Sequence, residues 1–256
     1  MKKLVRMFGA LLLVSSAVFA ADNSIYINQI GSTSTIDIKQ DGSANKLYGV
    51  GDSEGTAAIF SGDSQTIDIR QIGASNLLGI DVNTTVDSGV GVDLTYIITG
   101  SFSVASIDIN GDGLGVAANN TIDIQQTGNY NDLILSLIGS GNTLTATTTG
   151  GTYNDLTFDI DADDITTSIA ISGGGGNLTG MTLGTDSSTV NYTAVGVTNA
   201  LTLTQSGAGG VSGHNFDLDI TGSSNELTVT QSGNAMYDTD VNITGSTNTW
   251  TIIQEQ

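Results

Sequence analysis

The sequence predicts an all-β fold, specifically a two-sheet β-solenoid, and three observations lead to this prediction. Apolar and polar residues alternate over runs of five to seven residues. Asn and Gly return at nearly constant intervals, and the 256-residue chain contains 34 Gly but no Pro. Alternation with a period of two is typical of half-buried strands. Proline cannot donate to a β ladder, so a chain made almost wholly of paired strands excludes it.

The alternation is clearest in the middle of the chain. Leu133, Leu135 and Leu137 share one parity, as do Ile122 and Ile124. No apolar pattern recurs at three or four residues, so the segments are strands rather than helices.

The strands belong to a repeat of 11 or 12 residues. Its unit is N-x-φ-x-φ-x-[Q or φ]-x-G, where φ is apolar, and about 20 units fill the chain after residue 20. Two strands and two turns make a rung of 22–23 residues, so we expect about ten rungs. Stacked at about 4.8 Å, they would form a rod roughly 48 Å long. A β-sandwich is a weaker alternative, because its strands share no such template.

Gly and Asn mark the predicted turns. Gly accepts positive φ without cost, and Asn tolerates it while its amide bonds the local backbone. The turn positions are Gly31, Gly42, Gly73, Gly128, Gly139, Gly150, Gly207, Gly222, Gly233, Asn45, Asn76, Asn131, Asn142, Asn225 and Asn248.

Glutamine occupies the last inward position of seven units. A buried amide without a partner is costly, but stacked amides can donate to one neighbour and accept from the other. We therefore expect a structural amide ladder of Gln29, Gln40, Gln71, Gln126, Gln205, Gln231 and Gln254.

The first 20 residues are predicted to be a secretory signal peptide. Lys2, Lys3 and Arg6 precede an apolar run that is too short to span a membrane, and Ala20 ends a small-residue cleavage site. Residues 21–256 form the solenoid domain. We expect an extracellular or cell-surface location without stable membrane insertion.

Removal of this segment leaves a strongly acidic chain. Three cations remain against 26 acidic residues, a formal charge of −23. Such a surface repels nucleic acid, so nucleic-acid binding is not expected. The chain has no Cys, which excludes disulfides and thiol chemistry.

The repeat resembles the curlin repeat of curli, the secreted adhesive amyloid fibres of bacteria. The family pattern S-x5-Q-x-G-x2-N-x-A-x3-Q is matched in part by Gln71, Gly73 and Asn76, and by Gln126, Gly128 and Asn131. Gln29 and Gly31 match near the start, where Ser24 is one residue closer to Gln29 than the pattern has, and Gln231 and Gly233 match near the end. The resemblance implies a two-sheet rung, nucleated assembly into extracellular fibres, surface adhesion and biofilm matrix. It also implies a nucleator or minor fibre subunit as a partner.

The middle of the chain departs from the family pattern. Leu137, Thr148, Ile160 and Ile171 stand where Gln is expected. Our hypothesis is that the Gln-bearing ends are stacking faces, because the uncapped end of a solenoid exposes strand edges. The expected partner is then a homopolymer of the chain itself.

Candidate sites for other chemistry are sparse, and no enzyme activity, cofactor or metal is expected. His214, the only His, falls at a turn position. Asp37, Asp68 and Asp123 take the outward parity, which suits a solvated face better than paired catalytic carboxylates. The string from Asp108 to Gly113 opens like an EF-hand loop, but Asn119 stands where a Glu ligand belongs.

Outward threonines suggest a second class of function. Thr143, Thr145, Thr147 and Thr149 form a row that recurs in part at Thr202 and Thr204 and at Thr228 and Thr230. Such rows resemble ice-binding solenoids, although β-branched residues also suit exposed strands. The sequence therefore favours a fibre subunit, with a monomeric cell-surface or virion module that binds ice, sugar or divalent cations as the alternative.

Overall fold

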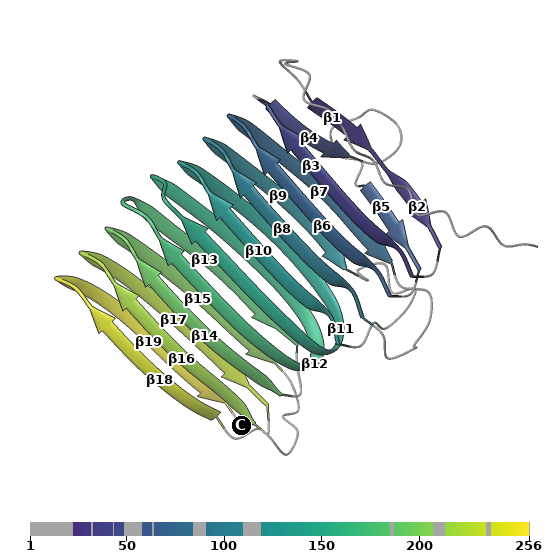
Figure 1. Cartoon of the computed structure of the whole chain (residues 1–256). Coiled ribbons are helices and arrows are strands. Elements are labelled where there is room, and N and C mark those ends of the chain that lie inside the picture. Colours follow the sequence, from purple (N-terminus) through teal and green to yellow (C-terminus); the bar gives the residue numbers. More distant parts are fainter. Residues whose placement is uncertain are drawn as a thin grey trace, which may run out of the picture.

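The computed structural model describes most of the chain after residue 22. The described residues are 23–31, 33–42, 44–48, 58–62, 64–83, 91–109, 119–184, 187–206, 213–233 and 237–255. All regular structure within them is β, in strands β1 to β19, and none of them is helical (Figure 1). The predicted signal peptide and Gly207 lie outside these ranges.

The strands form two stacks, which are linked because β11 and β12 each run from the first into the second. The first stack contains β1 (Asn23–Tyr26), β2 (Asn28–Ile30), β4 (Ala44–Tyr48), β5 (Ala58–Ser61), β7 (Ser75–Asn83), β9 (Phe102–Ile109), the start of β11 (Tyr130–Thr149), the start of β12 (Tyr153–Ser172), β13 (Gly176–Leu183), β15 (Thr198–Ser206), β17 (Ser224–Ser232) and β19 (Thr247–Glu255). The second stack contains β3 (Thr35–Asp41), β6 (Thr66–Ile72), β8 (Asp93–Thr99), β10 (Thr121–Thr127), the ends of β11 and β12, β14 (Ser188–Val195), β16 (His214–Thr221) and β18 (Tyr237–Thr244).

Pairing within each stack is parallel and joins each strand to its counterpart in the next repeat. Asn23 pairs with Asn45, 22 positions on, and Tyr130 pairs with Tyr153, 23 positions on. Thr35 pairs with Thr66, 31 positions on, so insertions lengthen some repeats. The chain thus winds along one axis from β1 to β19 (Figure 1). This arrangement confirms the prediction of an all-β solenoid.

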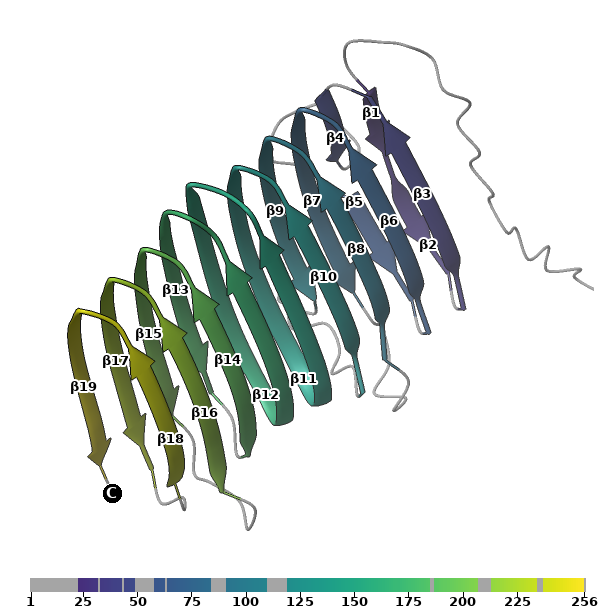
Figure 2. The same ribbon diagram turned by 60° about the vertical axis from the view of Figure 1, so that its left-hand side comes forward.

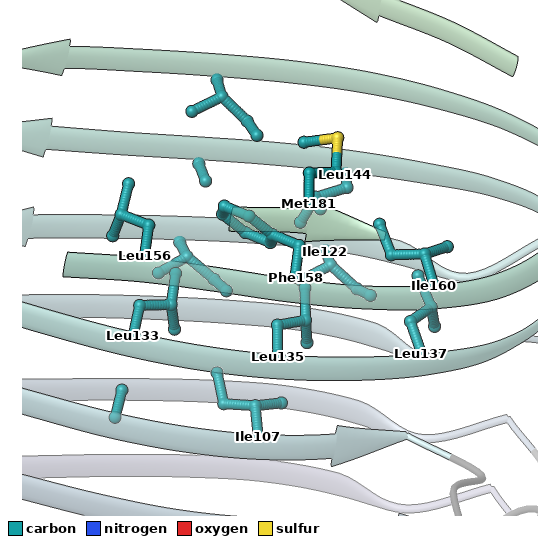
Figure 3. Close-up of a cluster of buried hydrophobic side chains, with 14 of the residues drawn as sticks. Ile107, Ile122, Leu133, Leu135, Leu137, Leu144, Leu156, Phe158, Ile160 and Met181 are labelled. Carbon is teal, nitrogen blue, oxygen red and sulfur yellow. The ribbon is translucent and has the colours of Figure 1, made fainter. Parts of the chain in front are cut away.

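The core lies between the two stacks. Side chains alternate between exposed and buried along each strand, as the period of two predicts, and Leu133, Leu135 and Leu137 are fully buried. Figure 3 shows them with Phe158 and other apolar side chains from neighbouring strands. Burying a side chain of this size contributes about 1.5–3 kcal/mol relative to exposure, so the stacked apolar columns stabilise the rungs collectively.

The two corners of the solenoid differ in how the chain crosses between stacks. From second to first, only two or three residues separate the strands, and these short connections lie along one edge (Figure 2). From first to second the separation varies: Ser61 is followed closely by Thr66, whereas Ile109 and Thr121 are farther apart. The short-connection side is here called the tight corner and the other the variable corner.

The tight corner carries a glycine column, one residue per repeat. Its members are Gly42, Gly73, Gly100, Gly128, Gly150, Gly173, Gly196, Gly222 and Gly245. At Gly222, the N–H donates to the Thr244 carbonyl (2.9 Å), and an added Cβ would collide with the Gly196 carbonyl oxygen. Close backbone approach therefore excludes a side chain there. At Gly150 the backbone φ angle is 89°, a conformation that glycine adopts far more readily than other residues, and this is a second reason for glycine at that position.

We predict that Gly222→Ala lowers the free energy of unfolding by about 1–3 kcal/mol, because the corner backbones must move apart. The matched control is Gly180→Ala, since a Cβ at Gly180 in β13 meets no atom within 4 Å. Urea denaturation of both variants would check this. Equal midpoints for the two variants would contradict the close-approach explanation.

Candidate functional site

An asparagine ladder runs inside the tight corner, three or four residues after the glycine column. Its members are Asn131, Asn154, Asn177, Asn199, Asn225 and Asn248. Each Nδ2 donates to the Oδ1 of the next member, at 2.8, 2.6, 2.6, 2.9 and 3.0 Å in that order. All but Asn248 are buried.

The ladder gives these asparagines a role other than the predicted tolerance of positive φ. None of the asparagines predicted as turn residues has positive φ. Asn225 Nδ2 also contacts the carbonyls of Gly222 (3.3 Å) and Thr244 (3.2 Å), so the ladder ties the amides to the corner backbone. Identical amides in register satisfy one another, which offsets their burial cost.

The ladder is interrupted where Ser103 replaces Asn. Ser103 pairs in register with Asn76 on one side and Asn131 on the other. Its side chain is too short to bridge them, and Asn76 Nδ2, Asn76 Oδ1 and Asn131 Oδ1 find no hydrogen-bond partner among the described residues. Asn45, before the gap, donates to the carbonyls of Gln40 (3.1 Å) and Ile72 (2.9 Å).

A shorter amide pair lies at the variable corner. Asn142, predicted as a turn residue, accepts from Asn120 Nδ2 at 2.8 Å. Asn120 Oδ1 in turn accepts from the Val92 N–H at 2.8 Å. Both asparagines are buried, so the two corners use the same kind of contact.

The seven predicted ladder glutamines fall into two separate columns. Gln40, Gln71 and Gln126 lie in the second stack, where Gln71 Nε2 donates to Gln40 Oε1 (2.6 Å). Tyr96 Oη donates to Gln71 Oε1 (2.9 Å), and Ile98 stands in register between Gln71 and Gln126.

The other four glutamines share one column of the first stack. Gln205, Gln231 and Gln254 are in successive register, and Gln254 Nε2 donates to Gln231 Oε1 at 2.9 Å. Gln29 begins the same column, but Phe60 follows it and apolar residues continue up to Leu183. The structure therefore brings together neighbouring amides near each end, and not all seven.

The β19 end of the solenoid leaves core positions uncovered. Trp250 is in register with Leu227, which is 1% exposed, yet Trp250 itself is 64% exposed. Val241, Ile243 and Ile252 are only partly buried there. Within the described residues β19 pairs only with β17, so its outer edge presents unpaired backbone groups.

His214 is buried rather than placed on a turn surface. Its exposed fraction is 2%, and its ring stacks on Tyr237 with centroids 5.6 Å apart. Gln205 Nε2 lies 2.8 Å from His214 Nε2, and Ser188 Oγ lies 2.8 Å from Nδ1. Both ring nitrogens are thus engaged inside the core.

The carboxylates lie on the outer faces. Asp37 and Asp68 are exposed and Asp123 is half-buried. Of the string that opens like an EF-hand loop, Asp108 and Ile109 end β9, while residues 110–118 lie outside the described residues. In the part of the chain that the structure describes, no group of three or more His, Asp or Glu side chains could hold a metal ion.

The predicted threonine rows lie on opposite outer faces. Thr143, Thr145, Thr147 and Thr149 point outward from the second stack, whereas Thr202, Thr204, Thr228 and Thr230 point outward from the first. On the second stack, Thr121, Thr143, Thr166 and Thr189 are in register in successive repeats.

Sequence reasoning did not find an aromatic column on the outer face of the first stack. Phe102, Tyr130 and Tyr153 are in register and exposed, with ring centroids 5.0 and 5.7 Å apart. Asp132 and Asp155 are paired two residues further along the same strands. Partial burial, and secondly the charge of Asp155, raise the pKa of Asp132.

We predict that Asn177→Ala breaks the asparagine ladder and costs about 1–3 kcal/mol for each amide group left unpaired. The groups that lose their amide partner are Asn154 Nδ2, which keeps only the Gly150 carbonyl at 3.4 Å, and Asn199 Oδ1. Asn191→Ala is the control, because Asn191 is exposed on β14. Chemical denaturation of both variants gives the comparison, and similar losses would argue against the ladder as a stabilising feature.

Asp132→Asn should raise the melting temperature at pH 7. The raised pKa of Asp132 means that the folded state disfavours its charge, so removing the charge favours folding. The gain should fade as the pH falls through the raised pKa and wild-type Asp132 becomes protonated. Asp68→Asn, next to Arg70 on an outer face, should give no such gain at pH 7. Melting curves between pH 7 and pH 4 test this, and a gain independent of pH would contradict it.

The described part of the chain contains no helix with the length and apolarity to cross a bilayer. No protein-family model, curated protein or solved structure matches this chain.

Proposed function

We propose that the protein is a secreted structural subunit that assembles end to end, by strand stacking, into an extracellular adhesive fibre like curli. The observation that carries this proposal is the uncovered β19 end, where Trp250 is 64% exposed in a column that is otherwise buried or half-buried. Stacking of a second copy would cover this side chain and pair the free strand edge.

The residues at the two ends are suited to such a junction. Trp250 and Ile25 belong to the same column of the first stack, as do Gln254 and Gln29. If β1 and β2 of one copy continued the stack above β19 of another, Trp250 would lie on Ile25 and Gln254 on Gln29. The contact would then repeat the amide pairing of Gln254 with Gln231.

Several further properties belong to the same proposal. We infer about ten rungs in two sheets, supported by the parallel pairings that continue from β1 to β19. The basic and apolar start of the chain supports export through a signal peptide at residues 1–20 and an extracellular location. We propose a structural role without enzymatic activity, in which stacking edges replace a binding pocket.

The test uses residues 21–256 and the double variant Gln29→Glu with Gln254→Glu. We expect wild type to form fibres under negative-stain microscopy with a thioflavin signal. The double variant should elongate at least tenfold more slowly, because it would place two carboxylates face to face at the junction. A double control, Gln125→Glu with Asn191→Asp, makes the same charge change on exposed outer positions of β10 and β14. Wild type that stays monomeric, or a double variant that grows like the control, would refute the proposal.

A second candidate function is that of a monomeric module that binds an ordered surface such as ice. It is favoured by the register of Thr121, Thr143, Thr166 and Thr189 on one outer face. Parallel strands repeat these hydroxyls at about 4.8 Å. Thermal hysteresis from monomeric protein, lost in Thr143→Lys, would support this function, whereas its absence would exclude ice as the ligand.

A further inference from the structure

On the outer face of the first stack, β13 lacks a side chain at two outward positions, on either side of the half-exposed Leu178. This strip of surface is here called the trough. Its outward positions include Gly176 and Gly180, which lack side chains, with Leu178 between them. A Cβ at Gly180 would meet nothing within 4 Å, so the space above it is open. The outward residues of β12 form one wall, and the small outward residues of β15, such as Thr198 and Thr202, form the other.

The aromatic column ends at this trough. Tyr130 stacks on one face of Tyr153. The next residue in register beyond Tyr153 is Gly176, and a Cβ there would be 3.6 Å from Tyr153 Cδ1. Because residue 176 is a glycine, the second face of the Tyr153 ring is left without a side chain against it, and an atom at the Cβ position would be in van der Waals contact with the ring. This space is here called the Gly176 slot. Tyr153 is the most exposed ring of the three, at 58%.

The wall on the β12 side is acidic. Asp155 and Asp159 project from the same face as Tyr153, and Asp132 lies one repeat back from Asp155. The cations in the described part of the chain, Lys39, Lys46 and Arg70, lie in β3, β4 and β6, several repeats away. The trough therefore combines a flat aromatic surface with negative charge that no nearby cation balances.

We propose that this trough binds an extended, arginine-bearing segment of a partner protein. Side chains on one face of an extended chain are spaced by about 6.6–6.8 Å, as are the outward positions of β12. One guanidinium stacks on Tyr153 in the Gly176 slot, and others pair with Asp155 and Asp159. A planar cation suits both contacts, since arginine stacks on aromatic faces and binds carboxylates through two hydrogen bonds.

Two properties of the trough favour this occupant over an uncharged one. The pKa of Asp132 is raised, first by partial burial and secondly by the charge of Asp155, and a cation beside the two carboxylates would relieve their repulsion. Phe102 stacks on Tyr130 and Tyr130 on Tyr153, so the column offers a sugar separate end faces and not one continuous aromatic platform. The trough is on an outer face, so the inference does not depend on whether the ends polymerise.

The experiment measures binding of residues 21–256 to a fluorescent peptide, acetyl-Ser-Arg-Ser-Arg-Ser-Ser-Ser-Arg-amide, by anisotropy at low salt. Its three Arg residues have the same spacing as Tyr153, Asp155 and Asp159 along β12. Matched peptides replace Arg with Lys or with citrulline, which is flat but uncharged. We expect the Arg peptide to bind most tightly and the citrulline peptide least. Gly176→Thr, which fills the slot, and Tyr153→Ser should each weaken Arg-peptide binding two- to fivefold, the range of an exposed cation–π contact.

Controls separate this site from general attraction to an acidic protein. Ala170→Thr adds the same side chain on the opposite outer face of β12, and Asp217→Asn removes a charge from β16. Asp155→Asn should weaken binding more than Asp217→Asn, and Ala170→Thr should leave it unchanged. Equal effects of site and control variants would mean nonspecific electrostatic attraction and overturn the proposal. Equal binding of Arg and citrulline peptides would also overturn it.

Discussion

The tight corner sets the constraint on which the rest of the solenoid depends: each repeat must place its backbone directly against that of the previous one. Gly222 shows the constraint most plainly, since a single methyl group would strike the Gly196 carbonyl. Once the corners stack this closely, the following asparagines come into register and bond one another. The same register then places apolar residues over apolar residues through the core. Stability is therefore cooperative between neighbours, as in other repeat architectures.

Much of this architecture could be predicted from the residues alone. The alternation in β10 and β11 and the absence of Pro predicted strands, and the common spacing predicted stacked repeats. The structure confirms both, with parallel pairing between the repeats. The roles of polar residues inside the rungs were harder to predict. A repeating Asn suits a turn as well as a buried ladder, and only its position relative to the Gly carbonyls distinguishes the two. His214 is similar, because its burial depends on Ser188 and Gln205 from adjacent strands.

The outer faces were the least predictable part. The sequence shows that Tyr130 and Tyr153 point outward, but stacking also requires that they occupy the same position in successive repeats. Insertions at the variable corner disturb the spacing along the chain while leaving the spatial register intact. For this reason the aromatic column and the trough beside it emerge only in three dimensions, whereas the core emerges from periodicity.

The contrast between the two corners has a consequence for how such a chain can change. The tight corner varies by only one residue in length, between two and three, and its glycines stay stacked in both cases. The variable corner, between β9 and β10 for example, accepts extra residues without shifting the strands on either side. New sequence, and with it new surface chemistry, can therefore accumulate along one edge of the rod while the scaffold stays the same.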